Sequence, residues 1–112
     1  MKKLEIIVRP EKFGEVVSAL HGAGVMGMTV TDVRGQGRQR GVVHYYRGAE
    51  YRVDLVMKVK VEAVVPDALV EPVVEAVCAV ARTGEVGDGK IFISEVLDAV
   101  RVRTGERGDL AL

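Results

Sequence analysis

The chain has 112 residues and a mass of 12.1 kDa, which suits one compact domain and is too small for two. Its 16 basic and 16 acidic side chains cancel, which argues against a general binder of nucleic acid or acidic membranes. One cysteine, Cys78, and two histidines, His21 and His44, exclude an internal disulfide and a cysteine–histidine zinc site, and no apolar run reaches the roughly 20 residues of a membrane span.

Four segments alternate apolar and polar residues with the period of two that is typical of strands. They lie around residues 2–9, 27–34, 51–65 and 90–94. In the third segment the alternation predicts a covered face made of Val53, Leu55, Met57, Val59 and Val61, opposite Asp54, Lys58, Lys60 and Glu62. The chain therefore contains at least one sheet with a covered face and a polar face.

Between these strands the apolar period changes to that of a helix. The spacing i, i+3, i+4, i+7 begins at Phe13 and again at Val70, and it predicts amphipathic helices over about 13–20 and 70–81. Pro10 and Pro66 precede the two segments, and Gly22 and Gly84 follow them, where helix start and stop signals belong. Two helices therefore interrupt the four strands.

The resulting order is strand, helix, strand, strand, helix, strand. It predicts the α+β, ferredoxin-like split βαβ fold (βαββαβ), with both helices on one face of an antiparallel sheet. The other face needs a cover, so we expect a homo-oligomer. Residues 1–112 are expected to form a single domain, and the segment from about 37 to 53 is too long for a tight turn and predicts a projecting loop.

Two glycine-rich loops carry cationic side chains. Residues 84–90 have the spacing of a phosphate-binding P-loop, but Ile91 replaces the hydroxyl that would hold magnesium, and a strand follows instead of a helix. Taken alone, this run is better interpreted as a glycine-rich connector, although Gly87 and Gly89 allow backbone N–H groups to approach an anion beside Lys90. The loop at 35–41 lacks the dinucleotide fingerprint, and a flexible hinge is its simpler interpretation.

Eight of the ten arginines fall in two stretches, at 34–52 and at 101–107. Arg101 and Arg103 lie on one face of an extended segment, a geometry that suits phosphate oxygens, although an isolated pair is more simply a charged edge strand. The two glycine loops and this arginine pair together indicate a discrete anionic ligand.

Six stretches resemble the signatures of the PII nitrogen-regulatory signal-transduction proteins, in matching order over essentially the whole chain. They are residues 27–31 (GMTVT), 37–39 (GRQ), 46–51 (YRGAEY), 81–84 (ARTG), 87–92 (GDGKIF) and 101–106 (RVRTGE). The resemblance implies a homotrimeric regulatory protein, not an enzyme, that binds ATP or ADP in clefts between subunits and 2-oxoglutarate beside Mg²⁺-ATP. The projecting loop would be the family's T-loop, which controls partners such as an ammonium transporter or nitrogen-assimilation enzymes and regulators.

The resemblance also implies the roles of individual residues. The nucleotide would be surrounded by Thr29, Gly35, Gly37, Arg38, Gln39, Val64, Gly87, Asp88, Gly89 and Lys90, with Arg101 and Arg103 reaching its phosphates from the adjoining subunit. Gln39 would ligate Mg²⁺. The 2-oxoglutarate carboxylates would be held by the backbone of Gln39, Arg40 and Gly41, together with Lys58. Tyr51 corresponds to the tyrosine that some members have uridylylated or adenylylated, which leaves open a nucleotidyltransferase as a partner.

Some residues depart from the family pattern, and they lie in or beside the T-loop. Residues 42–45 (VVHY) replace the more usual His-Thr-Glu-Leu, Gln36 replaces a common aromatic residue, and Met57 replaces a common proline. Ala49 stands where some relatives carry a phosphorylated serine, so that form of control is not expected. Because of these changes, the identity of the partner protein is not predicted. They also permit a second hypothesis: a PII-like paralogue that binds adenine nucleotide but senses a different small anion.

A phosphoryl-transfer enzyme is the least favoured hypothesis. No carboxylate stands in a recognisable base position beside the glycine loops, and the P-loop hydroxyl is missing. The N-terminus offers no secretion signal, so we expect a cytoplasmic protein without membrane insertion or a direct nucleic-acid partner, and recruitment to a membrane by a partner stays open.

Overall fold

The computed structural model describes residues 1–37, 43–46, 49–52 and 55–112. The first half contains β1 (Lys2–Val8), the short 3-10 turn η1 (Pro10–Lys12), α1 (Phe13–Gly22) and β2 (Thr29–Gly35). Two short strands follow, β3 (Val43–Tyr46) and β4 (Ala49–Arg52). The second half contains β5 (Val56–Val65), η2 (Asp67–Leu69), α2 (Val70–Ala81), β6 (Gly89–Glu95) and η3 (Gly108–Ala111).

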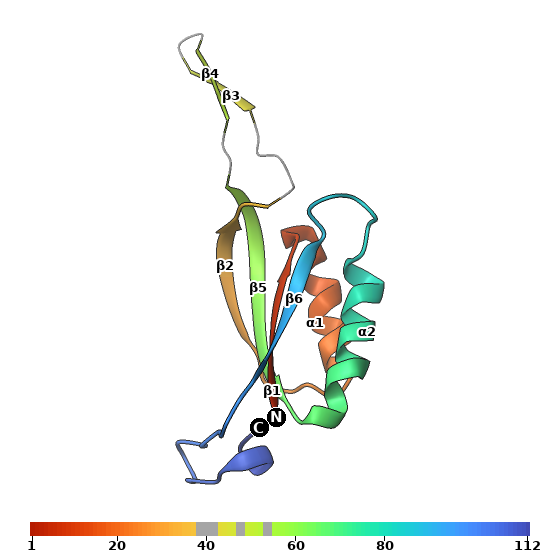
Figure 1. Ribbon diagram of the computed structural model, residues 1–112, viewed down its shortest axis with the longest axis vertical. Helices are drawn as coiled ribbons and strands as arrows, with labels where there is room; N and C mark the ends of the chain where they lie inside the picture. Colours follow the sequence, from red (N-terminus) through yellow and green to blue (C-terminus); the bar gives the residue numbers. More distant parts are fainter. Residues whose placement is uncertain (38–42, 47–48, 53–54) are drawn as a thin grey trace.

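Four of the strands form one antiparallel sheet in the order β2-β5-β1-β6, and α1 and α2 lie side by side on one of its faces (Figure 1). Strand β1 is central, paired along its whole length with β5 on one side and with β6 on the other. This is the split βαβ arrangement, so the predicted α+β fold is confirmed. Both predicted helices are present, and their apolar stripes face the sheet.

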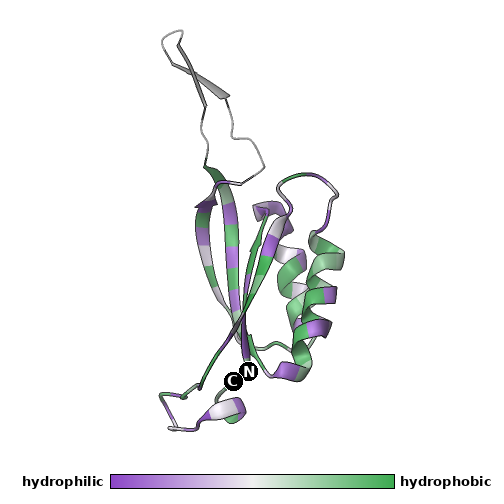
Figure 2. Ribbon diagram, in the orientation of Figure 1, coloured by the Kyte–Doolittle hydropathy of each residue, from purple (hydrophilic) through white to green (hydrophobic). Residues whose placement is uncertain are grey.

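The core lies between the sheet and the two helices. It is formed almost entirely by branched aliphatic side chains, which suit a pleated surface packed against helices. The largest fully buried side chains are Leu4, Ile6, Val16, Leu20, Val61, Val65, Val73 and Val77. Hydrophobic and hydrophilic residues alternate along β5 (Figure 2), and its buried hydrophobic residues are those that face the helices.

The predicted covered face of the third strand is correct only in part. Val59 and Val61 are buried, but Leu55 and Met57 are 48% and 51% exposed, and the side chain of Val53 lies outside the described residues. Lys58, expected on the polar face, is only 7% exposed. The helices cover the sheet from Val59 onward and do not reach the start of β5. The apolar side chains at the start of β5 therefore have no helix to pack against and stay exposed.

The segment predicted as a projecting loop contains an antiparallel pair of strands. β3 and β4 are in register with His44 opposite Tyr51. Each strand has four residues, which is too short for its alternation to stand out in the sequence, although valine and tyrosine favour strands. β5 consequently begins at Val56 and not at 51, because Ala49–Arg52 pairs with β3. Within the described part of the chain, neither helix is long and apolar enough to cross a membrane.

Candidate anion-binding site

A cleft of about 660 Å³ opens where the end of β2, the start of β5 and the loop before β6 meet. It contains much of the predicted site. Among the residues that line it are Gly35, Gly37, Lys58, Gly87, Asp88, Gly89 and Lys90, together with Gln36, Glu85 and Phe92. The structure therefore brings together predicted site residues that are up to 55 positions apart in the sequence, Gly35 and Lys90.

The loop between α2 and β6 forms one wall of this cleft and is closed on itself by Asp88. One carboxylate oxygen, Oδ2, accepts hydrogen bonds from the backbone N–H groups of Thr83 at 2.8 Å and Gly84 at 2.9 Å. The other, Oδ1, accepts the hydroxyl of Thr83 and the Nε of Arg9, the latter at 3.2 Å. Both oxygens of Asp88 are thus engaged within the protein.

Glycine is required in this loop at Gly89. Its φ is +108°, in the region that L side chains rarely adopt. A Cβ on Gly89 would lie 1.8 Å from the carbonyl oxygen of Ile7, because β6 starts here in close contact with β1. Gly87, with a φ of +104°, provides the same backbone freedom two residues earlier.

Lys58 lines the cleft, is buried and contacts the same loop. Its Nζ donates a hydrogen bond to the carbonyl oxygen of Gly87 at 2.5 Å. Burial lowers the pKa of the Lys58 ammonium and the Arg9 guanidinium lowers it further, whereas Glu11 and Asp88 act in the opposite direction. A buried cation beside a glycine loop is a group that can neutralise a bound anion.

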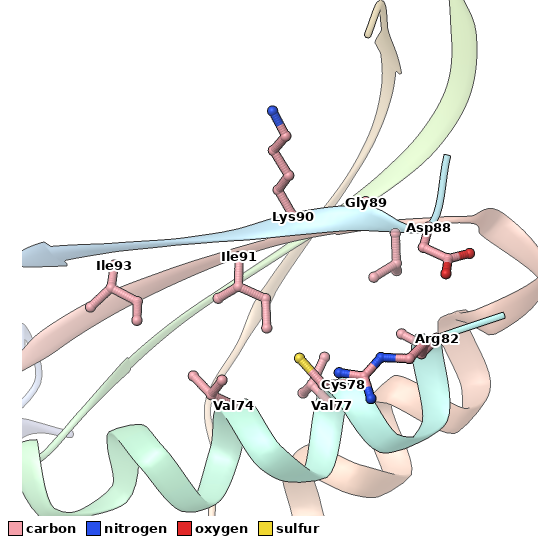
Figure 3. A pocket seen from close by; sticks show the side chains of 11 residues that line it. Val74, Val77, Cys78, Arg82, Asp88, Gly89, Lys90, Ile91 and Ile93 are labelled. Carbon is pink, nitrogen blue, oxygen red and sulfur yellow. The ribbon is translucent and has the colours of Figure 1, made fainter. Parts of the chain in front are cut away.

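Lys90 projects from β6 on the side away from α2, whereas Ile91 and Ile93 point toward that helix (Figure 3). The alternation of β6 thus separates two surfaces. On the Lys90 side is the cleft described above, and on the helix side is a second cleft of about 400 Å³ between α2 and β6, with Cys78 and Arg82 among its lining residues. The cation predicted to face the ligand is therefore on the same side of the sheet as Lys58.

Other predicted site residues lie at the opposite end of the sheet. Thr29 begins β2 and Val64 lies near the end of β5, six residues beyond Lys58, which at about 3.3 Å per residue corresponds to roughly 20 Å along the strand. Arg101 and Arg103 follow the far end of β6, in the tail near the two termini (Figure 1). Arg101 donates to Glu106 Oε1 at 3.1 Å, and Arg103 is exposed. One chain does not bring these residues to the cleft.

The remaining predicted residues are not characterised structurally. Arg38, Gln39, Arg40 and Gly41 lie outside the described residues. Tyr51 is placed in β4, and its side chain is not described. Within the described ranges no group of three or more histidine, cysteine, aspartate or glutamate side chains could hold a metal ion by itself.

Two residues of the site were missed at the sequence level, Arg9 and Thr83. Arg9 donates to Asp88 and, through Nη2, to the carbonyl oxygen of Val86 at 2.9 Å. The only sequence signal for Arg9 is a charged residue where an apolar strand ends, directly before Pro10. Thr83 stands in the ARTG stretch quoted above, but the sequence alone does not show that its hydroxyl bonds to Asp88.

Asp88 should give the protein a defined acid sensitivity. Hydrogen bonds from Thr83, and then from Gly84 and Arg9, hold the pKa of Asp88 well below its usual range. A lowered folded-state pKa stabilises the fold above the unfolded pKa of about 3.9, and this contribution is lost as the pH falls below that value. Asp88→Asn should therefore be less stable than the wild type at neutral pH, and the difference in urea midpoint should shrink below about pH 4.

The matched control for this prediction is Asp109→Asn, in the C-terminal turn and away from the loop. It should follow the wild-type urea midpoint throughout the pH series. An Asp88→Asn deficit that stays constant from neutral pH down to about pH 3 would contradict the role given to the ionised carboxylate.

Comparison with known proteins identifies the family. The model of the family described as nitrogen regulatory protein P-II matches residues 1–106. The chain is 54% identical over 112 residues to a nitrogen regulatory protein P-II of Rhodospirillum rubrum, and 56% identical to one of Microchaete diplosiphon, with both chains fully covered in each case. It is 55% identical to nitrogen regulatory protein P-II 2 of Methanothermobacter thermautotrophicus, covering all of this chain and 97% of the relative. The chain belongs to the nitrogen regulatory protein P-II family.

Proposed function

We propose that this protein is a non-catalytic sensor that binds ATP or ADP in the cleft at the 84–90 loop and binds 2-oxoglutarate beside Mg²⁺-ATP. The single observation that carries the proposal is the joining of a glycine loop with the two lysines, Lys58 and Lys90, in one cleft. Backbone N–H groups and ammonium groups are the donors that a polyphosphate chain requires. A volume of about 660 Å³ lies within the range of small-molecule sites.

The site is proposed to lie between subunits of a homotrimer. Arg101 and Arg103 lie at the end of the sheet away from the cleft, so a second copy would have to supply them. A second copy would also have to supply Thr29 and Val64. The sequence interpretation did not assign these two residues to the adjoining subunit. A head-to-tail contact that closes after three copies would bring the tail of one chain to the cleft of the next.

The 2-oxoglutarate subsite is proposed to include Lys58 and the backbone of Gln39, Arg40 and Gly41. Mg²⁺ would be held by the ATP phosphates and the side-chain oxygen of Gln39, and when bound it would supply positive charge for a 2-oxoglutarate oxygen. Lys58 fits this role because it is a buried cation that lines the cleft. The strands β3 and β4 belong to the proposed T-loop, whose conformation would report occupancy to partner proteins such as an ammonium transporter or nitrogen-metabolism enzymes.

Isothermal titration tests the proposal directly. The protein would be titrated with Mg²⁺-ATP, and with 2-oxoglutarate before and after the nucleotide. Heat from 2-oxoglutarate only after Mg²⁺-ATP supports the sensor. Nucleotide binding without any 2-oxoglutarate response supports instead the paralogue that senses another small anion, a hypothesis that the unusual residues 42–45 permit. Absence of both responses would refute the proposed ligands.

Gln39→Ala should abolish the 2-oxoglutarate response while ATP still binds. The proposed reason is that Gln39 completes the Mg²⁺ coordination on which the second ligand depends. Titration of 2-oxoglutarate into the Mg²⁺-ATP complex measures the effect, and Glu75→Ala, which changes an exposed residue of α2 that does not line the cleft, is the control. An intact 2-oxoglutarate response in Gln39→Ala would contradict the placement of the metal.

A further inference from the structure

The loop from Thr83 to Asp88 is attached to the sheet by cations at three successive residues. Arg9, just beyond the end of β1, donates through Nη2 to the carbonyl oxygen of Val86 at 2.9 Å and through Nε to Asp88 Oδ1 at 3.2 Å. Lys58, from β5, donates to the carbonyl oxygen of Gly87 at 2.5 Å. Arg9 is therefore the side chain that holds the loop at two points.

These attachments determine the direction of the loop's N–H groups. In a planar trans peptide the C=O and the following N–H point in opposite directions. When the carbonyls of Val86 and Gly87 are directed to Arg9 and Lys58, the N–H groups of Gly87 and Asp88 must point away from those cations. An anion held by these two N–H groups would therefore lie on the side of the loop away from Arg9 and Lys58, and fixing the N–H groups in advance avoids the cost of reorienting the loop on binding.

The contacts of the Asp88 carboxylate also explain why the loop needs a guanidinium group at residue 9 to hold it. Its Oδ1 and Oδ2 are occupied by Arg9, by the hydroxyl and N–H of Thr83 and by the N–H of Gly84. Arg9 pairs with this carboxylate and reaches a carbonyl two residues away with a second nitrogen of the same planar group. A lysine ammonium is a single point donor on a flexible stem and does not reproduce this fork.

We propose that Arg9 is a positioning residue of the anion site: it sets the direction of the Gly87 and Asp88 N–H groups and does not itself hold the ligand. The identity of the ligand, Mg²⁺-ATP, rests on the proposed function. The loop geometry is independent of the proposed function, because all of these contacts are made within the chain itself.

Three variants test this inference: Arg9→Lys, Arg9→Met and, as a matched control, Lys12→Met. Lys12 lies three residues after Arg9 and pairs with Glu15 on α1 at 3.3 Å, so its replacement removes the same charge at the same end of the protein. Amide hydrogen exchange of residues 84–88 in the ligand-free protein is measured first, and Mg²⁺-ATP affinity by titration second. Thermal unfolding of each variant shows whether the fold is retained.

Both Arg9 variants should exchange the loop amides about tenfold faster than the wild type, since each loses hydrogen bonds to charged groups. Both should bind Mg²⁺-ATP about tenfold more weakly, while Lys12→Met matches the wild type in both measurements. Arg9→Lys is decisive, because it keeps the charge and the size of the side chain and loses only the fork.

Several outcomes would overturn the inference. If Arg9→Lys behaves like the wild type, Arg9 acts as a charge and not as a positioning group. If exchange of residues 84–88 does not change in either variant, the loop does not depend on Arg9. If the wild type itself binds no Mg²⁺-ATP, the proposed function fails, and faster exchange in both Arg9 variants would still support the loop-positioning role on its own.

Discussion

Gly89→Ala should destabilise the protein by about 3–5 kcal/mol, from the sum of an unfavourable positive φ and a steric overlap. The added Cβ would lie 1.8 Å from the Ile7 carbonyl oxygen and 3.1 Å from the Cα of Val8. These are backbone atoms of the central strand, so no side chain can move aside to relieve the contact. β6 would have to separate from β1 at its first residues, which carry Lys90 into the cleft.

Urea unfolding measures this loss, and Mg²⁺-ATP titration of whatever remains folded should show no binding. Gly14→Ala is the matched control. Gly14 lies in the first turn of α1 with open space where its Cβ would be, so alanine should leave stability unchanged or raise it by up to about 1 kcal/mol. A Gly89→Ala protein that loses less than about 1 kcal/mol would show that β1 and β6 do not approach as closely as described.

Arg103→Ala should weaken Mg²⁺-ATP binding by about 10- to 100-fold, the loss expected when a charged hydrogen bond to phosphate is removed. The stability of the subunit should be unaffected, because Arg103 is exposed. Arg107→Ala is the control from the same tail: Arg107 pairs with Asp98 at 2.8 Å and is not assigned to the phosphates, so its replacement should cost much less affinity. Unchanged affinity in Arg103→Ala would remove the phosphate role from this residue.

The same variant can show whether the site is shared between copies. Lys90→Glu reverses a charge in the cleft, whereas Arg103→Ala leaves the cleft intact and alters the tail. If these two proteins are unfolded and refolded together in equal amounts, about a quarter of the sites of a head-to-tail trimer would combine an intact cleft with an intact tail. Tight ATP binding at about that fraction is expected, and none is expected from either variant alone.

The layered part of the fold could be predicted because its signal is local. The stripes that begin at Phe13 and Val70 each face the sheet, and the alternation in β1 and in the later part of β5 marks the buried residues. The exposure of Leu55 and Met57 could not be predicted, since the strand pattern does not say where the covering helices end. Nor did the sequence pattern separate β4 from β5, whose boundary depends on pairing with β3.

The candidate site divides in the same way. The glycine loop and Lys90 were predicted because glycine spacing and a neighbouring charge are visible within a few residues. Arg9 was not, because its contact with Asp88 joins residues 79 positions apart. That contact exists only because β1 pairs with β6 in antiparallel register, which places Val8 opposite Gly89. Lys58 was likewise not predicted to be buried, because it contacts Gly87. Gly87 lies in a loop far along the chain, so the sequence pattern of β5 carries no sign of this contact.

The placement of the cleft and the arginine tail at opposite ends of the sheet has a consequence for how the proposed sensor responds to its own concentration. A ligand held by groups from two chains binds the assembled protein and not the separated subunit, so mass action requires the ligand to stabilise the assembly. Dilution below the assembly constant should then lower the apparent affinity for nucleotide, and saturating nucleotide should lower the protein concentration at which subunits separate. Nucleotide would thus control not only the shape of the sensor but also how much of it exists in working form.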